Sequence, residues 1–145
     1  MRFVLTAATV VVVAGMAGFG GGTAWAHHSF VAEFDPAKPK TIQGTVAQIQ
    51  WENPHARFYV MVKNAGASGG YDRWEVELGS PNNLIKYGWT RKTLAPGMKV
   101  TVSGYLARDG HRYMNSTSVK LPNGHTVNAG SSYHGGAETG KTPGL

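Results

Sequence analysis

The sequence predicts a mainly β domain, a small five- to six-stranded barrel of the oligonucleotide/oligosaccharide-binding (OB) type with one short helix between its third and fourth strands. Only 15% of the residues are charged and 20 are glycine, which is typical of a β-rich domain with many turns. Short segments rich in β-branched and aromatic residues alternate with turn-forming residues. The order of three strands, a helix and then further strands matches the OB barrel. A β-sandwich is the alternative.

The first 26 residues have the features of a secretory signal peptide. Arg2 supplies a positive charge, residues 3–17 are almost all apolar, and Ala24-Trp25-Ala26 matches the small-x-small cleavage pattern. A transmembrane anchor is the alternative, but the apolar stretch is shorter than the roughly 20 residues that cross a bilayer, and glycines follow it at once. We therefore expect cleavage after Ala26, a periplasmic mature protein and no stable membrane anchor.

The mature chain is expected to begin with an extended lead-in at 27–40, because Asp35 and Lys38 each precede a proline and the residue before a proline avoids helical backbone. Strand segments follow, identified by β-branched and aromatic content, by alternation of apolar and polar residues, and by the turns between them. They are expected at 41–51, 57–63, 72–78, 98–107, 112–121 and 125–129.

The clearest alternation is in the third segment, where Val76 and Leu78 share a face and Glu77 lies on the opposite one. A helix is predicted over 80–88, because Ser80 suits the N-cap and Pro81 the first helical position. We expect the barrel domain, with its lead-in, to span 27–131. The Gly/Ser/Thr-rich segment 132–145 is expected to be a disordered tail.

Charge and composition limit the function. The formal net charge is +6, but the basic residues are scattered without a run, so we expect no nucleic-acid partner. The absence of cysteine excludes disulfides, thiolate zinc sites and iron–sulfur clusters. The sequence contains no nucleophile elbow, zinc-peptidase motif or phosphate-binding loop, so it gives no evidence of an enzyme. A periplasmic protein or a small ligand is the expected partner.

Several short motifs follow one another along the mature chain in a specific order. They are His27-His28-Ser29-Phe30, Phe34-Asp35, Gly44-Thr45-Val46, Trp51-x-Asn53-Pro54-His55, Trp74-Glu75-Val76-Glu77-Leu78-Gly79-Ser80-Pro81-Asn82 and Gly88-Trp89-Thr90-Arg91. From about His27 to Ser131 the chain resembles a family of small exported bacterial proteins catalogued only as a domain of unknown function. The resemblance implies export and a compact β domain. It implies no activity, substrate or cofactor.

The histidines that follow the cleavage site suggest a metal site. Cleavage after Ala26 would give His27 a free α-amine, with a pKa near ~7.7, beside its own imidazole. With His28 or His55 as a second imidazole, the set resembles the histidine brace that holds copper, which nitrogen ligands bind most tightly among common divalent ions. Cleavage one residue earlier would place a histidine third, as in the amino-terminal copper and nickel motif. An inert polar terminus is the alternative.

Other candidate residues flank this site. His55 is expected in the turn between the first two strands, either as a ligand or as a turn cap that packs on Trp51. Asp35 and Glu77 are candidates to orient an imidazole, or else pair with arginines. Trp51 and Trp89 would form a ligand platform or belong to the core. The sequence thus predicts a small periplasmic binding protein that binds copper through its N-terminal histidines. The alternative is a metal-free ligand- or partner-binding module or an accessory subunit.

Overall fold

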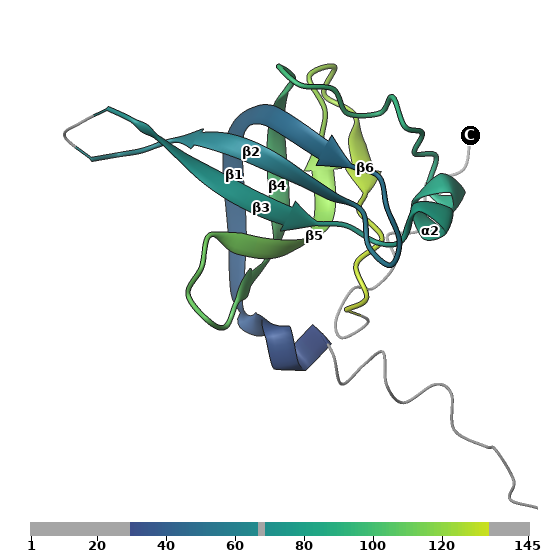
Figure 1. Ribbon diagram of the computed structural model, residues 1–145, viewed down its shortest axis with the longest axis horizontal. Helices are drawn as coiled ribbons and strands as arrows, with labels where there is room; N and C mark the ends of the chain where they lie inside the picture. The colour runs from purple at the N-terminus through teal and green to yellow at the C-terminus, as the bar shows by residue number, and fades with distance from the viewer. Residues whose placement is uncertain (1–29, 67–68, 134–145) are drawn as a thin grey trace, which may run out of the picture.

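A computed structural model describes residues 30–66 and 69–133, in which six strands form one ring-like sheet (Figure 1). The elements are β1 (Phe34–Gln50), β2 (Arg57–Lys63), β3 (Tyr71–Glu77), α2 (Pro81–Lys86), β4 (Lys99–Ala107), β5 (Tyr113–Lys120) and β6 (Thr126–Asn128). The strand order is β3-β2-β1-β4-β5-β6, and β3 also pairs with β5 in parallel, which closes the ring. The predicted OB-like barrel, with its helix between the third and fourth strands, is confirmed.

Strand β1 holds the barrel together because it pairs with β4 through its first part and with β2 through its last. Gly44 lies where β1 passes from one partner to the other, and Thr45 next to it pairs with both Met61 and Lys99. A Cβ at position 44 would lie 2.4 Å from the carbonyl oxygen of Met61, so a glycine is required for this close approach.

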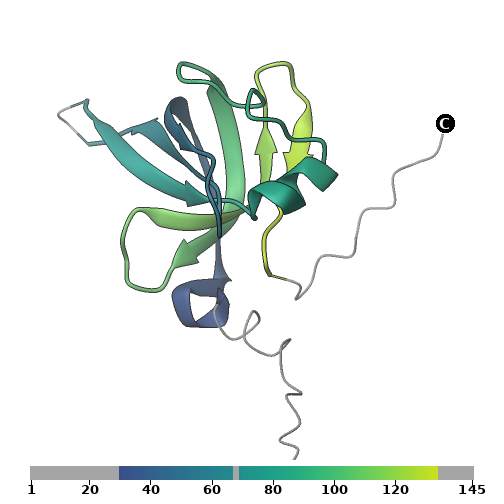
Figure 2. The same ribbon diagram turned by 45° about the vertical axis from the view of Figure 1, so that its right-hand side comes forward.

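The main core fills the barrel with inward-facing residues from every long strand. Its fully buried members include Phe58 and Val60 of β2, Val76 of β3 and Val102 of β4. Helix α2 adds Leu84 at the end of the barrel, where Figure 2 shows the helix beside β6 and the segment that follows it. Ser80 caps this helix as predicted, since its hydroxyl accepts a hydrogen bond of 3.2 Å from the amide of Asn83.

A second, aromatic cluster fixes both ends of the described chain. Phe30, Phe34 and Ala107 are buried in it, and Tyr105, Tyr113 and Tyr133 pack around them. The rings of Phe30 and Tyr133 stack with centroids 4.9 Å apart.

This cluster corrects two expectations about the chain ends. Residues 30–33 are helical rather than extended, and β1 begins at Phe34, seven residues before the predicted start at 41, because Phe34 is buried opposite Ala107 of β4. The predicted start of the disordered tail at 132, in the expected segment 132–145, is too early, because Tyr133 is packed into the cluster. The proposed signal peptide and residues 134–145 lie outside the described residues. No helix in the described ranges is long and apolar enough to cross a membrane.

Candidate functional site

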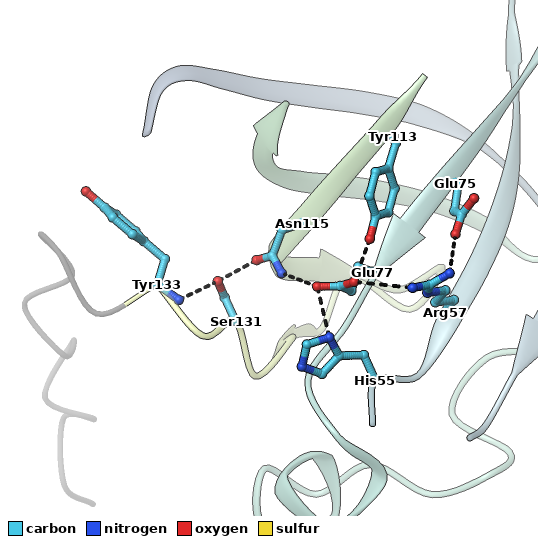
Figure 3. A network of polar contacts seen from close by, with 8 residues as sticks. All are labelled: His55, Arg57, Glu75, Glu77, Tyr113, Asn115, Ser131 and Tyr133. Carbon is cyan, nitrogen blue, oxygen red and sulfur yellow. Dashed lines mark hydrogen bonds and ion pairs between the residues drawn. The ribbon is translucent and has the colours of Figure 1, made fainter. Parts of the chain in front are cut away.

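His55 is the one predicted metal ligand that lies in the described part of the chain, since His27 and His28 fall outside it. It sits in the loop between β1 and β2, next to Ala56. The Ala56 amide donates a hydrogen bond to the Gly79 carbonyl, and the Ala56 carbonyl accepts one from the Leu78 amide, just after β3. This pairing brings the His55 ring to the end of β3. Its Nδ1 lies 3.1 Å from Oε1 of Glu77, and 36% of its side chain is exposed (Figure 3).

Glu77 is the centre of the polar network drawn in Figure 3, although it is only 3% exposed. Besides His55, its carboxylate accepts hydrogen bonds from the Tyr113 hydroxyl at 2.5 Å and from Nδ2 of Asn115 at 3.1 Å. Nη2 of Arg57 lies 3.7 Å from Oε2. Each oxygen of this buried carboxylate therefore has two polar partners nearby.

The sheet explains why these residues meet. Glu77 is opposite Arg57 in the antiparallel pair of β2 and β3, and opposite Asn115 in the parallel pair of β3 and β5. Glu77, the last residue of β3, thus has a paired strand on each side within the sheet. The parallel pairing that closes the barrel also buries Glu77 and supplies the Tyr113 and Asn115 donors.

The contacts in this network favour the charged forms of both the Glu77 carboxylate and the His55 imidazole. Burial opposes ionisation of Glu77, but the hydrogen bonds from His55, Tyr113 and Asn115 together outweigh it and lower the pKa of Glu77. The hydrogen bond to Glu77 is also the main reason that the pKa of His55 is raised. Burial and the contact with Glu77 raise the pKa of Tyr113, which keeps its hydroxyl a donor.

This arrangement determines which nitrogen of His55 is available to a ligand. A neutral His55 that keeps its bond to Glu77 carries its proton on Nδ1, so the lone pair is on Nε2. Figure 3 shows the second ring nitrogen pointing away from the carboxylate. An imidazole oriented by a carboxylate in this way is the usual form of a metal-binding histidine.

The network continues from Glu77 to the end of the described chain. Oδ1 of Asn115 accepts a hydrogen bond from the Ser131 hydroxyl at 2.5 Å, and the same hydroxyl accepts one from the Tyr133 amide at 3.1 Å. The segment that carries the Phe30–Tyr133 stack is therefore bonded, through two side chains, to the carboxylate that holds His55.

The other predicted site residues have different surroundings. Asp35 lies 3.7 Å from both Lys38 and Arg108 and accepts a hydrogen bond from the Ala37 amide. None of the described histidines contacts it, so its role in orienting an imidazole stays a prediction for His27 and His28. Trp89 is 2% exposed and its indole donates to the Asn128 carbonyl at 2.7 Å. Its ring is part of the core, so the interpretation as an exposed stacking platform is wrong.

Trp51 is partly buried against the core and lines a groove of about 530 Å³ to which Trp89 also contributes. The residues that the sequence did not single out are Tyr113, Asn115 and Ser131, which complete the network around Glu77. Within 30–66 and 69–133, no three His, Asp or Glu side chains are grouped so that they could hold a metal ion.

Comparison with known proteins gives a family but no activity. No curated protein matches the sequence. The crystal structure of the mitochondrial single-stranded DNA-binding protein of S. cerevisiae is similar with a TM-score of 0.46 and 9% identity, over 59% of this chain and 93% of that one. A family model, described as a family of unknown function (DUF6152), matches residues 16–116, which is more than half of the sequence. The chain therefore belongs to the family of unknown function DUF6152.

Proposed function

We propose that this protein is a small periplasmic binding protein that holds a copper ion between His55 and the new N-terminus formed by signal-peptide cleavage. The observation that carries the proposal is the contact of 3.1 Å between Nδ1 of His55 and the buried carboxylate of Glu77. This contact leaves Nε2 of His55 as a pre-oriented metal ligand at a partly exposed position. The α-amine and imidazole of His27 would supply two further nitrogen ligands, and His28 is the alternative imidazole.

The position of the lead-in supports this assembly. Phe30 is 3% exposed and stacked on Tyr133, so the chain is anchored three residues after His27. A segment of three residues spans at most about 11 Å. Phe34, four residues after Phe30, packs on Tyr113 with ring centroids 5.0 Å apart, and the Tyr113 hydroxyl donates to the same carboxylate that holds His55.

Copper binding at this site is expected to depend on pH. A metal replaces the proton on the imidazole, so binding competes with protonation of His55. Because the pKa of His55 is raised above its usual value of 6.5, this competition starts at a higher pH than for a free histidine. The affinity for Cu(II) should therefore fall as the pH decreases through this raised pKa.

The test is isothermal titration with Cu(II) of the mature protein that begins at His27. Two changes should each weaken binding at least tenfold: the variant His55→Asn, which keeps a donor to Glu77 but has no Nε2, and one extra residue before His27, which blocks the amine. His125→Ala, at an exposed turn, is the matched control and should bind as the wild type does. Micromolar or weaker binding that the extra residue leaves unchanged would exclude the proposal.

A metal-free ligand-binding module is the second candidate, and the groove beside Trp51 favours it. Native mass spectrometry of the exported protein separates the two. A bound mass of one copper ion supports the first proposal. A bound organic mass that is lost in Trp51→Ala but kept in His55→Asn supports the second.

A further inference from the structure

A second groove, of about 590 Å³, lies where β1 changes partners and shares no residue with the His55 network. It is formed by the middle of β1, the ends of β2 and β5, and the start of β4. Gly44 is among the residues that line it. Three lysines from three different strands lie along it, namely Lys63, Lys99 and Lys120.

The strand register brings these lysines together. Lys99 pairs across the sheet with Thr45, which also pairs with Met61, and Lys63 follows two residues after Met61 on the same face of β2. Lys120 pairs with Thr101, two residues after Lys99 on β4. All three side chains are exposed.

No carboxylate lines this groove, and none of the three lysines forms an ion pair in the part of the chain that the structure describes. Like charges along one groove repel one another, and the free energy of that repulsion is recovered when an anion binds. A cleft lined by charges of one sign also concentrates counter-ions of the other sign. The charge pattern therefore selects an anionic ligand.

The remaining lining indicates a ligand larger than a single anion. Tyr71 pairs with Lys63 across the β2–β3 ladder, lines the groove and is 63% exposed. Leu121 and Pro122 add apolar surface to the lining. The three lysines come from three different strands that line an open groove. An exposed ring beside spaced cations suits a chain of sugar rings, whose faces pack on tyrosine and whose acidic groups meet the lysines.

We propose that this groove binds an acidic oligosaccharide, with Lys63, Lys99 and Lys120 pairing with its carboxylate or sulfate groups and Tyr71 stacking on a sugar ring. The proposal is independent of copper binding, because the two sites share no residue. His55→Asn should leave oligosaccharide binding unchanged.

The test measures binding of the mature protein to heparin-derived and polygalacturonate oligosaccharides, with neutral dextran oligosaccharides of equal length as the comparison probe. The triple variant Lys63→Gln, Lys99→Gln, Lys120→Gln should lose about tenfold or more in affinity. The matched control is Lys40→Gln, Lys86→Gln, Lys92→Gln, which removes the same charge from other exposed positions and should change affinity less than about twofold. Tyr71→Ala should weaken binding severalfold while leaving its salt dependence unchanged.

Three results would overturn the proposal. Equal losses in the two triple variants would show attraction by net charge alone. Full competition by inorganic phosphate at equal concentration would show a simple anion site without recognition of sugar. Tighter, lysine-dependent binding to vesicles of anionic lipid than to either oligosaccharide would assign the groove to a membrane headgroup.

Discussion

At the scale of single residues, Glu77 and His55 make the stability of this domain depend on pH in two directions. The pKa of Glu77 is lowered, so its contribution to stability is present above its usual value of 4.5 and is lost as the pH falls through the lowered pKa. The pKa of His55 is raised, so its contribution is fully present below 6.5 and is lost as the pH rises through the raised pKa. The charged pair therefore stabilises the fold most between pH 4.5 and 6.5.

Urea denaturation across this pH range tests the pair. The free energy of unfolding of the wild type should be highest in the weakly acidic window and decline on both sides. Glu77→Gln should flatten the profile and cost about 1–3 kcal/mol, because the donors around position 77 lose a buried charged acceptor. Glu75→Gln, two residues away in β3, is the control. It removes only the half-exposed contact of 3.0 Å with Arg57, so it should cost less than about 1 kcal/mol. A wild-type profile identical to that of Glu77→Gln would contradict the pairing.

The same residue shows where reading the sequence stops. Alternation in the third strand correctly separates Val76 from Glu77, and it gives Glu77 the polar face. That face is exposed in an open sheet, but here β5 pairs with β3 and its Tyr113 and Asn115 side chains contact Glu77. The sequence left open whether Glu77 orients an imidazole or pairs with an arginine, so it did not single out the contact with His55. Tyr113 and Asn115 could not be associated with Glu77 before the parallel pairing was known.

At the scale of elements, local sequence signals were sufficient to predict where a strand or helix begins or ends wherever a turn or cap marks that boundary. The predicted strand 57–63 has the bounds of β2, and Ser80 caps α2 as expected. The start of β1 was missed because Pro36 and Pro39 usually interrupt a strand. They are tolerated because the register of β1 against β4 is irregular between Phe34 and Pro39. Only the distant partner Ala107, and not any local pattern, fixes where β1 begins.

The irregularity between β4 and β5 gives a prediction at this scale. The register shifts between Ser103 and Gly104, and a Cβ at 104 would lie 2.0 Å from the carbonyl oxygen of Asn115. Because that neighbour is backbone, it cannot move without displacing β5. Gly104→Ala should therefore destabilise the protein by about 1–3 kcal/mol.

The loss should appear in the midpoint of thermal or urea unfolding, with Gly70→Ala as the control. Position 70 has open space around it and should change stability by less than about 0.5 kcal/mol. Gly104→Ala should also loosen the Asn115 contact to Glu77, since Asn115 is the residue that the new methyl group meets. Equal stability of the two alanine variants would contradict this account of the bulge.

At the scale of the whole molecule, the two ends of the described chain are held by one cluster. Phe30 near the start and Tyr133 near the end stack on each other, and both contact Tyr105 of β4. The Tyr133 amide also belongs to the polar chain that reaches Glu77. The start of the described chain is thus held in part by the segment that carries Tyr133.

Tyr133→Ala tests this coupling of the two ends. Loss of the two aromatic contacts and part of the apolar burial should cost about 1–3 kcal/mol of stability. More informatively, hydrogen exchange of the amides in 30–40 should accelerate strongly, although the substitution lies about a hundred residues away in sequence. Tyr87→Ala, whose ring is 47% exposed beside α2, is the control and should leave exchange in 30–40 unchanged. If copper is held as proposed, Tyr133→Ala should also weaken its binding, since it frees the lead-in while leaving His55 and Glu77 intact. Unchanged exchange at 30–40 would show that the lead-in is fixed by β4 alone.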